Sequence, residues 1–198
     1  FLAAVFALFL ALPGTRPRKA LLCAASYLFY AHWDWRFLGL LLGSTALDYV
    51  VGLRMHAAEG RARRNLLIAS LAGNLGALAA FKYGRFALEN LARLGLDVDA
   101  SFLPAEVPVG ISFYTFQTLS YSIDVYRRET GPCRSPLDFA LFVSFFPQLV
   151  AGPIVRGVEF LPQLRDVRPA PASEVALGAQ RFVWGLFKKV VIADHAAL

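Results

Sequence analysis

The sequence predicts an all-α fold, a polytopic transmembrane helical bundle, and three observations support this class. Hydrophobic residues make up 57% of the 198 residues, and the mean hydropathy is +0.52. Only 17% of the residues are charged, whereas a soluble domain carries about 25%. The apolar residues also cluster into long runs, as they do in helices that cross a membrane.

Seven apolar runs are expected to cross the membrane or to lie within it. A spanning helix needs about 20 residues, so we expect the first run to be the remnant of a longer helix and the second to be short. No basic region precedes the first run, which argues against a secretory signal peptide. The runs are Phe1–Leu12, Ala20–Trp33, Phe37–Leu53, Leu66–Tyr83, Pro108–Tyr126, Leu137–Val155 and Val175–Ile192.

Charged residues between these runs predict the orientation. Two of the connecting loops are rich in arginine and lysine, and the positive-inside rule places such loops in the cytoplasm. The net charge of +6 is therefore typical of a topology signal and not of a nucleic-acid-binding face. The topology after residue 127 stays open. The basic residues are Arg16, Arg18 and Lys19 in the first loop, and Arg54, Arg61, Arg63 and Arg64 in the third.

A short amphipathic helix is expected after the fourth run. Arg85, Glu89 and Arg93 recur at a spacing of four residues, and leucines occupy the opposite face. Such a helix is typical of the membrane surface, here the outer one. A cap on the bundle that faces the solvent is the alternative.

The segment Phe145–Arg156 predicts a broken helix. It carries two prolines, a glycine and a glutamine inside an apolar region. Proline removes a backbone donor, and irregular backbone in hydrocarbon survives only where protein covers it or where it lines a wet cavity. Gln148, Pro153 and Arg156 are therefore candidate residues of a substrate tunnel. A proline-kinked packing helix is the simpler alternative.

The fifth run carries a polar stripe. At 3.6 residues per turn, five polar side chains fall on one face, and four apolar ones fall roughly opposite. Such a stripe must face other helices or a wet lumen. Interhelical hydrogen bonding and a tunnel wall are both open interpretations. The candidates are Tyr114, Gln117, Thr118, Tyr121 and Asp124, opposite Phe113, Phe116, Leu119 and Ile123.

Other polar residues inside the runs carry less weight. Asp48 lies about one turn from the cytoplasmic end of its run and is expected to reach the interface, and Asn74 suits helix packing. Lys188 and Lys189 either mark a cytoplasmic helix end or bind an anionic acyl donor on that side.

No catalytic or metal-binding constellation is recognisable in these residues. The three histidines, His32, His56 and His195, are poor catalysts by position, and no phosphate loop, nucleophile elbow or zinc motif occurs. The cysteines, Cys23 and Cys133, form no disulfide or zinc framework. We therefore predict no metal site and no bound cofactor.

Several long segments resemble the bacterial branch of the membrane-bound O-acyltransferase family that includes the alginate O-acetylases and the D-alanine export proteins. The resemblance covers nearly the whole chain. Its segments are Asp48–Gly52, Phe81–Tyr83, Pro108–Gln117, Tyr121–Arg127, Phe145–Arg156 and Trp184–Asp194.

The resemblance implies a multi-pass enzyme of the bacterial inner membrane whose helices surround a central funnel. An acyl thioester, acetyl-CoA or an acyl carrier, would approach from the cytoplasm. The acceptor would be a hydroxyl of an exported polysaccharide such as alginate, with a periplasmic acetyltransferase as partner and membrane lipid around the bundle.

The family's catalytic histidine belongs to a Trp-His-Gly-type segment that has no counterpart here. We therefore expect residues 1–198 to be the N-terminal part of a longer transmembrane domain and to be inactive alone, with no catalytic residue among them.

Two other functions remain open at this stage. Broken helices are also typical of transporters and channels, although no internal repeat is visible. A scaffold without catalysis, which only recruits the periplasmic enzyme, is the other alternative.

Overall fold

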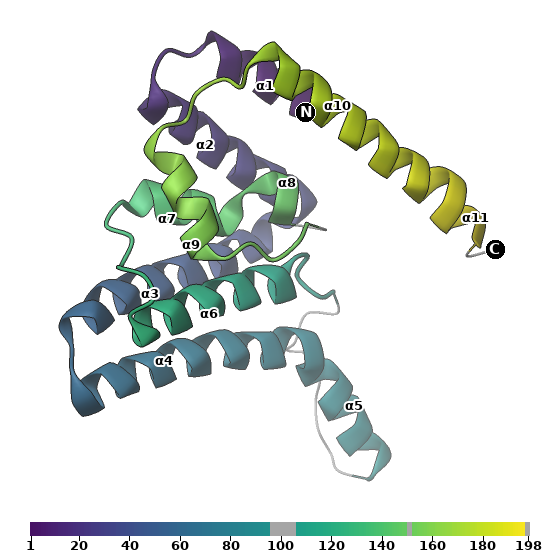
Figure 1. The fold of residues 1–198 in the computed structure, drawn as a ribbon. Coiled ribbons are helices and arrows are strands. Elements are labelled where there is room, and N and C mark those ends of the chain that lie inside the picture. The colour runs from purple at the N-terminus through teal and green to yellow at the C-terminus, as the bar shows by residue number, and fades with distance from the viewer. Residues whose placement is uncertain (96–105, 150–151, 197–198) are drawn as a thin grey trace. The chain divides into compact units, whose positions relative to one another are not determined.

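The structure is a computed structural model that describes residues 1–95, 106–149 and 152–196. All regular elements within these residues are helices, which confirms the predicted all-α class (Figure 1). The chain divides into two compact units, Phe1–Val167 and Arg168–Leu198.

The first unit begins with helices joined by very short turns. Gly14, with a positive φ of 83°, separates α1 from α2, and a 3-10 turn at Trp35–Phe37 joins α2 to α3. A π-helical turn at Ala79–Tyr83 connects α4 to α5. The helices are α1 (Leu2–Ala11), α2 (Thr15–Asp34), α3 (Leu38–Ala57), α4 (Gly60–Leu78) and α5 (Gly84–Arg93).

Two continuous helical stretches of this unit, Thr15–Ala57 and Gly60–Arg93, are long and apolar enough to cross a membrane. The helix α2 begins five residues before the predicted run, so Arg16, Arg18 and Lys19 lie in its first turns and not in a loop. The predicted amphipathic helix is confirmed as α5, where Arg85 and Glu89 form an ion pair of 2.8 Å.

The rest of the first unit consists of one long helix and several short ones. Gly110 precedes α6 and has a left-handed φ of 73°. A Cβ atom at this position would clash with the Leu149 carbonyl oxygen. Ser135 caps α7 by accepting a hydrogen bond from the Asp138 backbone. The elements are α6 (Ile111–Arg127), α7 (Pro136–Ser144), α8 (Phe146–Leu149), α9 (Gly157–Phe160) and the 3-10 helix η3 (Leu161–Arg165).

The sixth apolar run, Leu137–Val155, is broken, as its prolines predict. The run Leu137–Val155 does not form a single helix, because α7 ends at Ser144 and α8 ends at Leu149. The apolar stretch Pro136–Leu149 is too short to count as a candidate span. The predicted break in this region is confirmed.

The core of the first unit lies where α3, α4 and α6 pack against one another (Figure 1). The helix α7 packs against α2, α3 and α6. The largest side chains that this packing buries completely are Tyr114, Tyr121, Phe139, Phe142, Leu41 and Met55.

The second unit is helical from Ala172 to Ala196. It consists of α10 (Ala172–Phe187), a π-helical segment (Lys188–Ala193) and α11 (Asp194–Ala196). The predicted run Val175–Ile192 therefore forms helix, but this stretch is not among those that meet the length and hydropathy test for a span.

Candidate functional site

A buried carboxylate connects the three central helices. Asp48 on α3 is fully buried and accepts hydrogen bonds from the Ser70 hydroxyl at 2.6 Å and the Asn74 amide at 2.7 Å. The Ser122 hydroxyl on α6 lies 3.3 Å from the same carboxylate. An isolated acid in an apolar bundle is costly unless polar partners surround it, and here α4 and α6 supply them.

Asn74 extends this network to the surface of the bundle. Its side-chain oxygen accepts a 2.7 Å hydrogen bond from Ser44 on α3, and the Thr118 hydroxyl on α6 lies 3.4 Å away. Every polar atom of the Asn74 side chain is thereby engaged. A fully satisfied network of this kind fixes the register of the helices that it joins.

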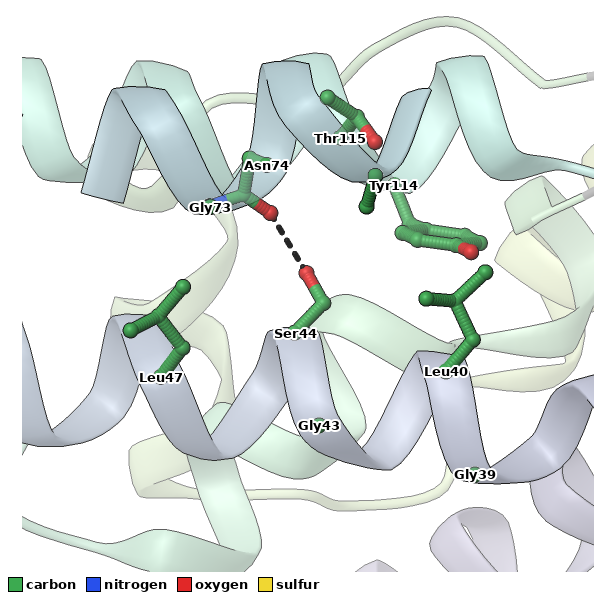
Figure 2. Close-up of a pocket in the computed structure, with 10 residues that line it drawn as sticks. Gly39, Leu40, Gly43, Ser44, Leu47, Gly73, Asn74, Tyr114 and Thr115 are labelled. Atoms are coloured by element: carbon green, nitrogen blue, oxygen red, sulfur yellow. Dashed lines mark hydrogen bonds between the residues drawn. The ribbon is translucent and has the colours of Figure 1, made fainter. Parts of the chain in front are cut away.

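Ser44 and Asn74 also line a cavity of about 230 Å³ between α3 and α4 (Figure 2). Gly39 and Gly43 form part of its α3 wall, and a Cβ at either would meet no atom within 4 Å. Tyr114, a predicted tunnel residue, contributes its ring to the lining, and its buried hydroxyl has no hydrogen-bond partner among the described residues.

The helix break at Phe145 is supported by side chains from two other helices. The Ser26 hydroxyl on α2 accepts a hydrogen bond from the Phe146 backbone N–H at 3.1 Å. The Gln117 amide on α6 donates to the Phe142 carbonyl at 2.7 Å, and the Gln148 amide lies 3.5 Å from the same oxygen. Backbone groups at the break therefore have hydrogen-bond partners on other helices.

Tyr121, another predicted tunnel residue, is completely buried. Its hydroxyl accepts a hydrogen bond from the Cys133 backbone at 2.9 Å, and its ring lies 4.8 Å from that of Phe139. Gly52 on α3 leaves room for it, because a Cβ there would lie 2.9 Å from the tyrosine ring. Gly157 also borders this ring, because a Cβ there would lie 3.2 Å from it.

An ion pair joins the segment after the break to the end of α6. Arg156 pairs with the buried carboxylate of Asp124 and with Glu129 at 3.1 Å. The hydrogen bond to Asp124 and the charge of that group raise the pKa of Arg156 above its ordinary value. The guanidinium is half exposed, so one end of this pair faces the exterior of the unit.

The structure thus brings most of the predicted tunnel residues together. All five predicted polar side chains of α6 are buried, and Phe116 on the opposite face is exposed. Leu119, expected on that outer face, is instead buried. Gln148 and Arg156 contact α7 or α6, whereas Pro153 lies in an exposed segment without helix.

The two predicted donor-side lysines lie in the second unit. Lys189 forms an ion pair with Asp194 one turn along the same helix. Lys188 begins the π-helical segment.

Sequence reasoning missed three residues that organise the first unit. Asp48 was expected at the interface and Asn74 only in packing, yet together they form the centre of the network. Arg63 belongs to a predicted loop, yet it is 7% exposed on α4 and donates to the Val125 and Tyr126 carbonyls at the end of α6. The available signal was the spacing of polar pairs, Ser70 with Asn74 and Thr118 with Ser122, four residues apart on apolar helices.

No group of three or more potential metal ligands occurs within residues 1–95, 106–149 and 152–196. A polar network of neutral donors around one carboxylate can hold helices in register and enclose a substrate.

Comparison with curated proteins shows relatives across most of the chain. The chain is 41% identical over 193 residues to a protein of Pseudomonas syringae pv. tomato named "Probable alginate O-acetylase AlgI", an alignment that covers 94% of this chain. The same name and identity apply to a Pseudomonas aeruginosa relative over 191 residues. The chain is therefore homologous to the alginate O-acetylases. These relatives confirm the resemblance to the membrane-bound O-acyltransferase family.

A further relative carries a different name. The chain is 39% identical over 206 residues to the "Peptidoglycan O-acetyltransferase" of Helicobacter pylori. This alignment covers 90% of the chain. The chain spans 36% to 39% of the length of these three relatives. No family model matches the sequence, and no solved structure matches it.

Proposed function

We propose that this chain is part of a multi-pass O-acetyltransferase of the bacterial inner membrane. It would help to move acetyl groups from a cytoplasmic thioester donor to hydroxyls of an exported polysaccharide. The observation that carries the proposal is the identity of about 40% over 94% of the chain with proteins named alginate O-acetylase.

The names of the relatives favour a glycan polymer as the acceptor. One name specifies alginate and another peptidoglycan, and the two share a polymeric carbohydrate with esterifiable hydroxyls. We propose an exported polysaccharide such as alginate as the acceptor, acetyl-CoA or an acyl carrier as the donor and a periplasmic acetyltransferase as the partner. By resemblance, the catalytic histidine belongs to a segment other than residues 1–198.

The arrangement of the first unit suits a role in enclosing this reaction. Transfer from a thioester to an alcohol needs proximity, removal of a proton and exclusion of water. The broken helix held by Gln117 and Ser26 offers irregular backbone inside a protein-covered region. We assign positioning roles to the polar face of α6, to Gln148 and to Pro153 and Arg156, and donor-side roles to Lys188 and Lys189.

Membrane vesicles of opposite orientation test the direction of transfer. Vesicles from cells that express the full-length protein would be incubated with acetyl-CoA radiolabelled in the acetyl group, and alkali-labile label in the glycan fraction would be measured. Inverted vesicles, which expose the cytoplasmic face, should incorporate label, and right-side-out vesicles should not. Vesicles from a strain without the gene provide the background.

The result also separates the alternatives. A scaffold without catalysis predicts that the periplasmic partner alone supports incorporation in vesicles that lack this protein. A channel for the acyl donor predicts that labelled donor itself enters sealed vesicles, which filtration would detect. We expect labelled glycan only in inverted vesicles that contain the protein.

A further inference from the structure

A second and larger cavity lies beside Glu129, between the end of α6 and the start of α7. Its volume is about 550 Å³, and it is lined by the connecting segment 129–135 and by residues of α7, α9 and η3. All of its lining residues belong to the unit Phe1–Val167. Its charged lining residues are Glu129, Arg134, Asp138 and Arg165.

The two acidic groups of this cavity are neutralised by cations that do not line it. Lys19 on α2 lies 2.5 Å from the Asp138 carboxylate. Arg156 lies 3.1 Å and Arg127 lies 3.7 Å from Glu129. These pairs remove most of the negative potential that the two carboxylates would otherwise give the cavity.

The two arginines that line the cavity are not paired with carboxylates in the described part of the chain. Within residues 1–95, 106–149 and 152–196, neither Arg134 nor Arg165 forms an ion pair. The backbone that carries Arg134 is fixed, because its carbonyl accepts a 3.0 Å hydrogen bond from Tyr49 and the neighbouring Cys133 N–H donates to Tyr121. Two guanidinium groups are therefore available to a ligand in a cavity with a defined wall.

We propose that this cavity binds a phosphate-bearing ligand through Arg134 and Arg165. Guanidinium groups bind phosphate with two parallel hydrogen bonds, and they cannot lose their charge at physiological pH. The cavity lies next to Arg127 and Arg128, on the side of the bundle that the positive-inside rule assigns to the cytoplasm. The phosphate can come from the nucleotide part of a thioester donor, which rests on the proposed function, or from an anionic lipid headgroup.

Cys133 reports on this cavity because it is one of its lining residues. Burial raises the pKa of its thiol, so its alkylation is slow but measurable at alkaline pH. Cys23 provides an internal reference, because it is buried in a separate apolar cluster with Leu141 and Leu164.

The experiment measures the rate of N-ethylmaleimide addition to Cys133 in the full-length protein. The protein would be placed in phosphatidylcholine nanodiscs, and the peptides that carry Cys133 and Cys23 would be quantified by mass spectrometry. In one arm, coenzyme A is added. In the other, phosphatidylglycerol replaces part of the lipid and no coenzyme A is present.

We expect one of these arms to slow alkylation of Cys133 about tenfold when the ligand is at about ten times its Kd. The rate at Cys23 should stay unchanged. Coenzyme A as the protecting agent identifies the donor, and phosphatidylglycerol identifies a lipid headgroup. If neither arm changes the rate at Cys133, the proposal is overturned.

Substitutions separate the proposed contacts from a general effect of charge. The double variant Arg134→Gln/Arg165→Gln should lose the protection, whereas Arg54→Gln, which removes an exposed arginine at the end of α3, should keep it. Arg134→Lys/Arg165→Lys keeps both charges and should retain part of the protection, which controls for misfolding of the first variant. Full protection in the double glutamine variant contradicts the assignment.

This measurement does not depend on acetyl transfer. Protection of Cys133 in a protein that transfers no acetyl group would leave this inference standing and would remove the proposed function. Acetyl transfer by a protein whose Cys133 is not protected would support the proposed function and overturn this inference.

Discussion

The side-chain amide of Asn74 donates a 2.7 Å hydrogen bond to the carboxylate of Asp48, and both residues are buried in the apolar core of the first unit. The same asparagine accepts a hydrogen bond from Ser44. One polar pair between α3 and α4 thus connects the centre of the bundle with the cavity at its surface.

The first prediction concerns this pair. Asp48→Ala leaves the donors of Ser70 and Asn74 buried without an acceptor and should lower the free energy of unfolding by about 2 kcal/mol. Thermal unfolding of the full-length protein in detergent measures the effect. Ser44→Ala removes one neutral hydrogen bond and should cost about 0.6 kcal/mol. Equal losses in the two variants would contradict the central role of Asp48.

The second prediction compares two neighbouring arginines on α4. Arg63 is buried and donates to carbonyls at the end of α6, at 2.6 Å to Val125, whereas Arg64 is exposed. Arg63→Met should reduce the free energy of unfolding by about 2 kcal/mol, because the Tyr126 carbonyl loses its donor and the Val125 carbonyl keeps only the Arg128 backbone N–H. Arg64→Met should change it by less than about 0.5 kcal/mol. A similar unfolding temperature for both variants would show that Arg63 does not hold α6.

The third prediction uses two glycines of α3. A methyl group at Gly52 would meet the ring of Tyr121 at 2.9 Å, and this ring is held by Phe139 and by the Cys133 backbone. Gly52→Ala should therefore cost about 1 to 3 kcal/mol through overpacking. Gly43→Ala meets no atom within 4 Å and should leave the protein as stable or slightly more stable, because alanine favours helix.

The fourth prediction concerns the support of the broken helix. Gln117→Leu removes the 2.7 Å donor to the Phe142 carbonyl, and the Gln148 amide at 3.5 Å cannot fully replace it. We expect reduced incorporation of acetyl label into glycan in inverted vesicles at normal protein level. Ser120→Ala is the matched control, because the Ser120 hydroxyl donates to the Gln117 carbonyl of its own helix and to no other group in the described part of the chain. Unchanged incorporation of acetyl label in the Gln117→Leu variant would show that this support of the broken helix is not needed for acetyl transfer.

The fifth prediction concerns the pH dependence of Cys133 alkylation. Burial raises the pKa of this thiol, so less thiolate is present at a given pH than for an exposed cysteine. The rate of alkylation should therefore rise at a higher pH in the folded protein than in the same protein unfolded by denaturant, where the pKa is about 8.5. Coincident pH profiles would show that the thiol is exposed to solvent.

Periodicity predicted much of this fold because apolar runs dominate the sequence. The predicted polar stripe of α6 is confirmed, since Tyr114, Gln117 and Asp124 recur at helical spacing and all are buried. The break near Phe145 followed from Pro147 and from the polar residues around it. These features depend only on residues that are close together in the sequence, so the sequence alone predicts them.

The partners of these residues could not be predicted in the same way. Asp48 looks like an interfacial acid until α4 and α6 are placed beside it, and Arg63 looks like a topology signal until the end of α6 is adjacent. Both interactions join residues far apart in the sequence, and periodicity contains no information on such pairs. The extent of α2 was missed for a related reason, because its first turn is basic and resembles a loop.

The proposed function requires the full-length protein for acetylation of an exported polysaccharide. The most direct test is the amount of alkali-released acetate per unit of purified envelope and secreted glycan in three strains: wild type, a deletion of the gene and the deletion complemented with the full-length gene. We expect loss of ester acetate in the deletion strain and its return on complementation. Unchanged ester acetate in the deletion strain would contradict the proposed function.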